Sequence, residues 1–331
     1  MDTLRNNANT KTYFETNLDD AKPAPYCAHL FPEAANAKEG GSFHYQGLDV
    51  PFFVSRAENE RAVFVAATGL NSYTSLRQDE LEQLNKAGVS VVWMALPPHK
   101  SGVPFMGKFI SAVEGFFTNE ESPAFKMFDR DLPRVAVTHS TSGQIMTALE
   151  QNPETNRKLM ATYRQALHIA PYFDATNVSM NHSWAPVRWA FHAHALLFKD
   201  RKPHESPLGR LYMEVAAGNE PFSKTGQVTS PTYAQILEVQ HYGRGLVSSF
   251  RNAAEDRDTT MPSTYLVGRN DPFASALTSI DMARKTDSAL VIVPKGGHYP
   301  INAEILKQYL ERIGVTEPAV EPLRDSPRLA A

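Results

Sequence analysis

Residues 134–143 (RVAVTHSTSG) constrain the fold most, because a β-branched apolar run ends abruptly in small hydroxyl residues and a glycine. The residues that follow, 144–150 (QIMTALE), favour a helix. A strand that turns at once into a helix can expose a serine at a strained apex, and this requires small neighbours. With Ser140 at the apex, those neighbours are Thr138, Ser142 and Gly143. The stretch therefore predicts Ser140 as a nucleophile.

Two other interpretations of this stretch stay open. Ser142 is the rival nucleophile, but it would place Gln144 where a small residue is needed. An elbow at Ser142 would also start two residues past the end of the strand. Alternatively, the stretch is a buried strand followed by a helix cap rich in Ser and Thr, since both residues favour N-caps.

Composition sets the broad class of the protein. The 331 residues are 42% hydrophobic and 21% charged, which suits one large α/β domain with an insertion, or two domains. A net charge of −3 gives no reason to expect nucleic acid or an anionic membrane as the main partner. Cys27 is the single cysteine, which excludes an intramolecular disulfide. The polar start and the lack of a membrane-length apolar run make a cytoplasmic protein the default expectation, and the oligomeric state stays unspecified.

Apolar runs alternate with helical patterns along most of the chain. Strands are expected at 62–67, 90–96, 135–140, 166–170, 264–267 and 289–293, helices at 78–86, 105–117 and 301–313, and a hairpin from 42–45 and 50–55. This alternation predicts an α/β fold, with a mostly parallel central sheet covered by helices on both faces.

The alternation stops between Phe173 and Met261. That stretch reads as mostly helical, and its position between two sheet strands predicts a helical lid over their carboxyl ends. The predicted organisation is an N-terminal arm (1–41), the first part of the core (42–173), the lid (174–261), the second part of the core (262–314) and a proline-containing tail (315–331).

A serine nucleophile needs a base, and the base needs an acid that orients it. Asp271 follows an apolar run and a turn glycine, and His298 follows the last expected strand and a Gly-Gly pair. Because the carboxyl ends of parallel strands meet at one edge of a sheet, these side chains are expected above the same edge as Ser140. A Ser, Asp or His at the end of a strand is common by itself, but all three at strand ends in this order point to a Ser-His-Asp triad.

The developing oxyanion needs two backbone amides. One is expected from Thr141, directly after the nucleophile. The other is expected from Leu70, in the loop after residues 62–67, where Gly69 lets the chain turn. A plain β-turn at Gly69 is the alternative.

These motifs resemble the α/β-hydrolase superfamily, and most of all its lysophospholipase and monoacylglycerol lipase (serine aminopeptidase-like) branch. That branch has H-G-x-x-E-H where this chain has residues 68–73 (TGLNSY), and G-H-S-M-G-G where it has 138–143 (THSTSG). Its acid and base motifs are matched by 268–272 (GRNDP) and 296–298 (GGH). At 95–102 (ALPPHKSG) the usual D-x-x-G-H-G-x-S is altered, and both elbow glycines are replaced.

The likeness covers residues 42–313 and implies a serine hydrolase that cleaves small carboxylic esters through an acyl-enzyme. The aromatic lid suggests an apolar acyl or aryl ester, with Trp184, Trp189 and Phe191 as candidate substrate contacts. No metal or organic cofactor is implied, since His192 and His194 lack a third ligand and are expected as solvated helix residues. No integral membrane segment is expected, and transient lipid contact stays open.

Two further classes of function stay open beside the esterase. One is a non-catalytic binding protein of the same fold, favoured by the altered elbow glycines. The other is a peptidase, thioesterase or C–C hydrolase with the same triad, because lid and pocket shape select the leaving group.

Overall fold

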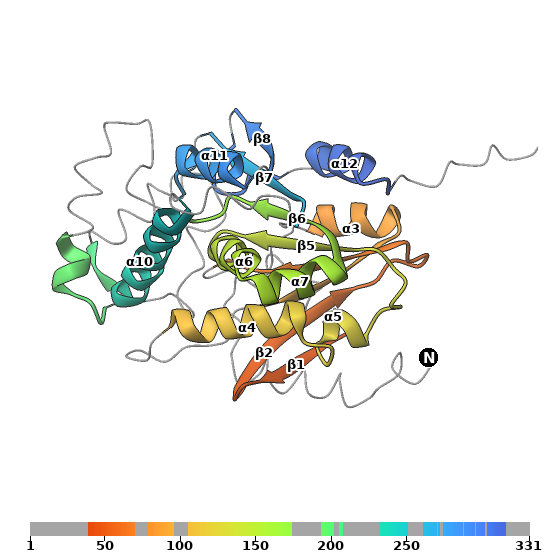
Figure 1. Cartoon of the computed structure of the whole chain (residues 1–331), viewed down its shortest axis with the longest axis horizontal. Helices are drawn as coiled ribbons and strands as arrows, with labels where there is room; N and C mark the ends of the chain where they lie inside the picture. The colour runs from red at the N-terminus through yellow and green to blue at the C-terminus, as the bar shows by residue number, and fades with distance from the viewer. Residues whose placement is uncertain are drawn as a thin grey trace, which may run out of the picture.

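The computed structural model describes residues 39–69, 78–95, 105–173, 193–201, 205–207, 232–250, 261–269, 271, 274–286, 288–294, 296–301 and 303–315 (Figure 1). An eight-stranded sheet forms its centre, in the order β1-β2-β4-β3-β5-β6-β7-β8. The strands are β1 (Glu39–Tyr45), β2 (Leu48–Ser55), β3 (Ala62–Ala67), β4 (Val89–Met94), β5 (Arg134–His139), β6 (Tyr163–Ile169), β7 (Ser263–Gly268) and β8 (Ala289–Val293). β2 pairs antiparallel with β1 and β4, and the remaining pairs are parallel.

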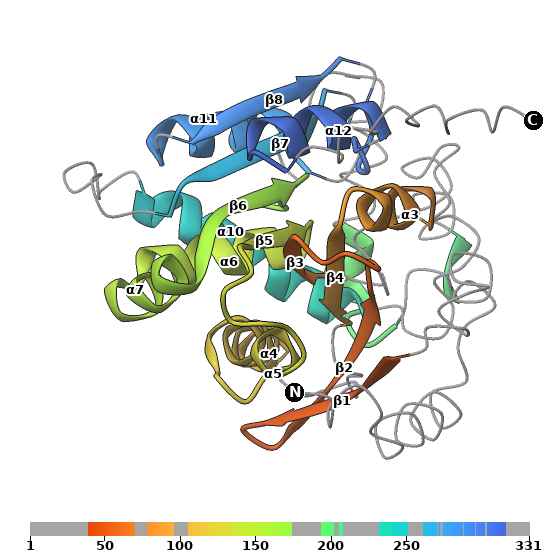
Figure 2. The same ribbon diagram turned by 90° about the vertical axis from the view of Figure 1, so that its right-hand side faces the viewer.

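Helices cover both faces of this sheet, as Figure 2 shows. They are α3 (Gln78–Lys86), α4 (Met106–Thr118), α5 (Pro123–Lys126), α6 (Thr141–Gln151), α7 (Pro153–Thr162), α10 (Tyr233–Phe250), α11 (Ala276–Lys285) and α12 (Ala303–Arg312). Successive residues of β5 point to opposite faces. Ala136 packs in the core formed with α4, α6 and α7, whereas Val135 and Val137 pack in the core formed with α3 and α12. The expected mostly parallel sheet with helices on both faces is confirmed.

The expected strands and helices are all present, with ends that shift by up to three residues. The hairpin is tighter than expected, because β1 and β2 are joined by Gln46 and Gly47 alone, at φ values of 49° and 77°. Such a two-residue turn with positive φ at both positions matches the twist of antiparallel strands.

Helix α7 was not expected from the sequence. Asn152 caps its start by accepting hydrogen bonds from the amides of Glu154 and Thr155, and Pro153 occupies its first turn. Asn followed by Pro is a sequence signal for a helix start, so this helix could have been found.

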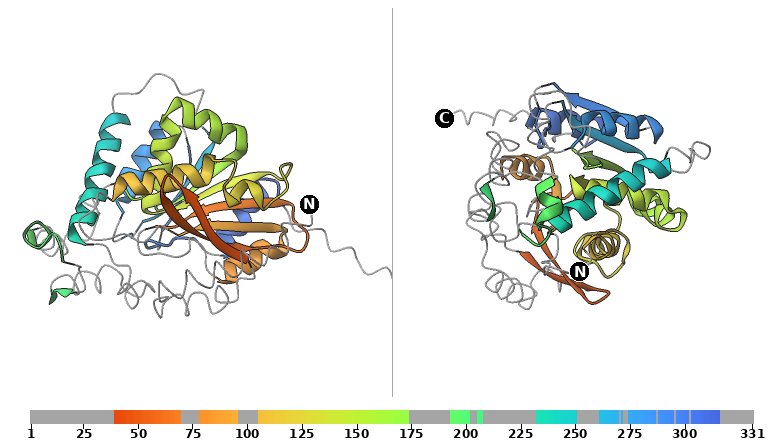
Figure 3. Two further views of the ribbon diagram at one scale, coloured as in Figure 1. Left: turned by 90° about the horizontal axis from the view of Figure 1, so that it is seen from below. Right: turned by 90° about the vertical axis from the view of Figure 1, so that its left-hand side faces the viewer.

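Helix α10 lies within the predicted lid, where residues 193–197 are also helical. It lies at the carboxyl edge of the sheet and packs against α4 and α6 (Figures 1 and 3). The Glu238 carboxylate of α10 accepts hydrogen bonds from the amides of Phe105 and Met106, at the start of α4. Negative charge at a helix N-terminus is favourable, so this contact holds α10 against the core. The domain boundaries themselves stay a prediction.

Candidate active site

Ser140 lies at a sharp turn between β5 and α6. Its backbone has φ 56° and ψ −117°, a conformation that costs a non-glycine residue about 1–3 kcal/mol. The surrounding structure holds this turn, since the Ser140 amide donates to the Ile169 carbonyl at 3.0 Å and its carbonyl accepts from the Tyr172 amide at 3.0 Å. The strand, the strained apex and the helix expected from the sequence are therefore all present.

His298 and Asp271 lie beside Ser140, although both are far from it in the sequence. His298 Nε2 is 2.9 Å from Ser140 Oγ, and His298 Nδ1 is 2.8 Å and 3.0 Å from the two Asp271 carboxylate oxygens. A carboxylate only accepts hydrogen bonds, so Nδ1 carries the proton and Nε2 presents its lone pair to the serine. The Ala274 amide donates to Asp271 Oδ1 at 2.8 Å, which fixes the carboxylate. The three side chains are nearly buried, so their electrostatic interaction is weakly screened.

A close backbone contact sets the distance between the acid loop and the base loop. A Cβ atom at Gly268 would lie 2.0 Å from the Gly297 carbonyl oxygen. Gly268 ends β7, just before Asp271, and Gly297 directly precedes His298. Glycine at 268 is therefore required by this close approach, in addition to the turn expected from the sequence.

The structure describes only one of the two residues whose amides are expected to bind an oxyanion. Thr141 is the first residue of α6, where helix amides have no carbonyl partner within the helix. Leu70 lies outside the described residues. Its neighbour Gly69 is so close to the elbow that a Cβ atom there would lie 2.8 Å from Ser140 Cβ. Gly69, just after β3, thus lies directly beside the serine.

Ser142, the rival nucleophile, is fully buried and bonded to backbone. Its hydroxyl lies 2.8 Å from the Ala67 carbonyl oxygen and accepts a hydrogen bond from the His139 amide at 3.0 Å. No His ring is within hydrogen-bond distance of it among the described contacts, whereas Ser140 has one. The geometry favours Ser140 over Ser142 as the residue that a base can activate.

His139 connects the elbow to the base loop. Its Nε2 donates to the His298 carbonyl oxygen at 3.1 Å, and its ring lies against the rings of His298 and Tyr299. Burial, reinforced by the neighbouring His298, lowers the pKa of the His139 imidazole to about 3. His139 is therefore neutral at neutral pH and adds no charge beside the base.

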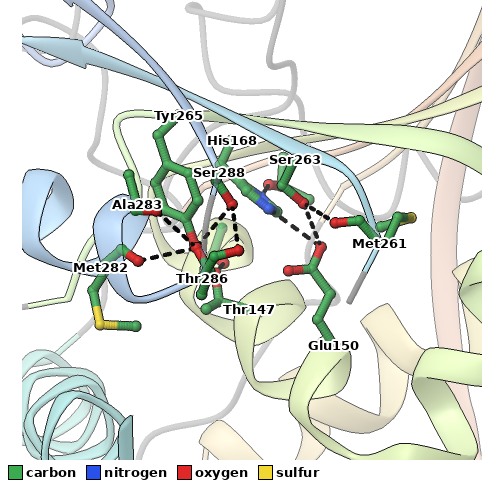
Figure 4. Close-up of polar contacts among 12 residues, drawn as sticks. Thr147, Glu150, His168, Met261, Ser263, Tyr265, Met282, Ala283, Thr286 and Ser288 are labelled. Atoms are coloured by element: carbon green, nitrogen blue, oxygen red, sulfur yellow. Dashed lines mark hydrogen bonds and ion pairs between the residues drawn. The ribbon is translucent and has the colours of Figure 1, made fainter. Parts of the chain in front are cut away.

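The sequence analysis missed a buried polar network, in which Glu150 contacts both His168 and Ser263 (Figure 4). His168 Nδ1 of β6 is 2.9 Å from Thr138 Oγ1, and His168 Nε2 is 3.3 Å from Glu150 Oε1 of α6. Ser263 donates to the same Glu150 oxygen at 3.4 Å. A histidine inside an apolar strand was the available signal, because a buried polar group requires partners.

Other predicted residues do not join this site. Trp184, Trp189, Phe191 and His192 lie outside the described residues. The expectation of a solvated His194 is wrong, because this residue is partly buried and its ring packs against Phe198 and Tyr233. In the part of the chain that the structure describes, no three His, Cys, Asp or Glu residues gather as a metal site. None of the described helices combines the length and hydropathy needed to cross a bilayer.

Comparison with known proteins bears on the fold. The profile of the alpha/beta hydrolase family matches residues 62–304. A soluble variant of monoglyceride lipase from Saccharomyces cerevisiae, in complex with a substrate analog, superposes with a TM-score of 0.56 at 13% identity, covering 82% of this chain and 92% of that chain. A carboxyl esterase from Bacillus coagulans, in complex with glycerol, superposes with a TM-score of 0.54 at 12% identity, covering 83% of this chain and 97% of that chain.

MenH from S. aureus is similar to the same extent, with a TM-score of 0.52 at 13% identity, over 80% of this chain and 97% of that chain. A search of curated proteins found no match. At these identities the likeness to solved structures concerns the fold, and it confirms the fold class expected from the sequence.

Proposed function

Because this chain belongs to the alpha/beta hydrolase family, we propose that it is a serine hydrolase that cleaves carboxylic esters through Ser140, His298 and Asp271. The observation that carries this proposal is the chain of hydrogen bonds from Ser140 Oγ through the His298 ring to the Asp271 carboxylate. Ser140 itself lies at a strained elbow. Family membership by itself supports the coarser statement, a hydrolase.

In the proposed acylation, Ser140 Oγ bonds to the ester carbonyl carbon while its proton passes to His298 Nε2. Asp271 stabilises the imidazolium that forms. The carbonyl electron pair moves to oxygen, where the amides of Thr141 and Leu70 stabilise the negative charge. When the tetrahedral species collapses, the bond to the alcohol oxygen breaks and the alcohol leaves with the proton from His298.

Deacylation repeats this path with water as the nucleophile. Water gives a proton to His298 Nε2 as its oxygen bonds to the acyl carbon, and the bond to Ser140 Oγ then breaks. The serine oxygen recovers the proton, and the carboxylic acid leaves. Neutral His139 beside the base suits this cycle, because a second positive charge there would oppose the imidazolium.

For the substrate, we propose a small ester with an apolar acyl or aryl group, similar to a lysophospholipid or monoacylglycerol. The similarity to a monoglyceride lipase and to a carboxyl esterase supports this choice. Trp184, Trp189 and Phe191 are proposed to contact the apolar group. Leu196 and Leu197 are 59% and 77% exposed, which supports transient contact with lipid. A chain-length series of p-nitrophenyl esters, followed by acylglycerol, thioester and amide panels, measures the preference.

The test of the mechanism is labelling with a fluorophosphonate probe. We expect the folded wild-type protein to label, and the Ser140→Ala and His298→Ala variants to lose labelling. The control is Ser249→Ala, which changes an exposed serine of α10 and should label like the wild type. A folded wild-type protein that does not label would contradict the proposal and favour the non-catalytic binding protein. The expected cytoplasmic location stays a prediction, which cell fractionation checks.

A further inference from the structure

The hydroxyl of Ser142 joins the ends of two neighbouring strands. Ser142 Oγ lies 2.8 Å from the carbonyl oxygen of Ala67, the last residue of β3. It also lies 3.0 Å from both the amide nitrogen and the carbonyl oxygen of His139, the last residue of β5. A hydroxyl has one proton, and the shorter contact directs it to Ala67, while the lone pairs accept from the His139 amide.

These two bonds enclose the elbow. His139 and Ser142 stand on either side of the strained Ser140, so the bond between them closes a short ring around the apex. The bond to Ala67 ties this ring to β3, two residues before Gly69, where an added Cβ atom would lie 2.8 Å from Ser140 Cβ. The strand that supports the nucleophile and the strand that leads to the proposed oxyanion loop already pair along their length. The Ser142 side chain adds a further link at their carboxyl ends, directly beside the elbow.

The family pattern that this chain resembles has glycine at this position, and glycine carries no hydroxyl. We propose that Ser142 is a positioning residue, which keeps the strained nucleophile in register with the oxyanion amides. This inference rests on the proposed serine hydrolase function. Stabilisation of a developing oxyanion depends steeply on donor placement, so a looser register lowers the rate of the chemical step rather than substrate affinity.

The test compares two Ser→Ala substitutions at equally buried positions. Ser142→Ala removes the joining hydroxyl. Ser122→Ala is the matched control, because Ser122 is also fully buried and donates to a backbone carbonyl, that of Phe116, at 2.7 Å, but lies at the start of α5. We measure kcat and KM on a p-nitrophenyl ester, the second-order rate constant of fluorophosphonate labelling, and the thermal midpoint of each protein.

We expect kcat and the labelling rate of Ser142→Ala to fall about 10- to 100-fold with KM nearly unchanged, as for a small misplacement of reacting groups. The Ser142→Gly variant has the residue of the family pattern, and its kcat and labelling rate should fall as far. Ser122→Ala should show a lower thermal midpoint and wild-type kcat.

Each outcome separates this inference from the function on which it rests. Wild-type kcat and labelling rate in both Ser142 variants would overturn the positioning role and leave the serine hydrolase proposal standing, with Ser142 serving stability alone. An equal loss of kcat in Ser122→Ala would also overturn it, because general loosening would then explain the effect. A wild-type protein that neither labels nor hydrolyses esters would overturn the two proposals together.

Discussion

Replacing Gly268 with alanine should separate Asp271, the proposed acid, from His298, the proposed base. The added methyl group would lie 2.0 Å from the Gly297 carbonyl oxygen and 2.6 Å from that of Gly296. Real contacts of this kind are not shorter than 3.0 Å, so the two loops must move apart by about 1 Å. Such a shift would break the 2.8 Å and 3.0 Å hydrogen bonds between His298 and Asp271.

We expect kcat/KM of Gly268→Ala to fall about 100-fold, the cost of a misplacement of about 1 Å, with a loss of about 1–3 kcal/mol in the free energy of unfolding. Ester hydrolysis and urea unfolding measure the two effects. The control is Gly107→Ala in α4, where a Cβ atom meets nothing within 4 Å, so kcat/KM should stay unchanged. A folded Gly268→Ala protein with wild-type kcat/KM would refute the argument that this contact positions the acid and the base.

Three further predictions follow from the site. Asp271→Asn should lower kcat by about 10³- to 10⁴-fold, because the amide favours the wrong tautomer of the base; near-normal steady-state kinetics would contradict this. Because the pKa of His139 is lowered to about 3 in the folded protein, only the unfolded chain gains this proton as the pH falls below about 6.5. Wild-type stability should therefore fall more than that of His139→Gln between pH 7 and pH 5 in urea unfolding, and equal losses would count against the lowered pKa. Thr138→Val should lose about 1–3 kcal/mol of unfolding free energy by leaving His168 Nδ1 unpaired, whereas Thr138→Ser should retain it; equal stability of the two variants in thermal unfolding would argue against this hydrogen bond.

Some features of the site followed from local sequence patterns. The apolar run of β5, the small residues after it and the helical pattern of α6 placed Ser140 at an elbow. Asp271 and His298 were found because each follows an apolar run at a turn, and parallel strands bring their carboxyl ends to one edge. The domain boundaries and the aromatic substrate contacts rested on weaker patterns, and they stay predictions.

The local patterns of this chain determined which segments form strands and helices, because periodicity, turn residues and caps act between near neighbours in the sequence. They also predicted the order in which the proposed nucleophile, acid and base follow one another along the chain. Only the tertiary structure decided which polar groups meet: the Ser142 hydroxyl with the Ala67 carbonyl, the His139 ring with the His298 carbonyl, and the His168 ring with the side chains of Thr138 and Glu150. These partners lie on different strands and helices, and sheet register and helix packing select them, so neither member of a pair identifies the other from sequence alone.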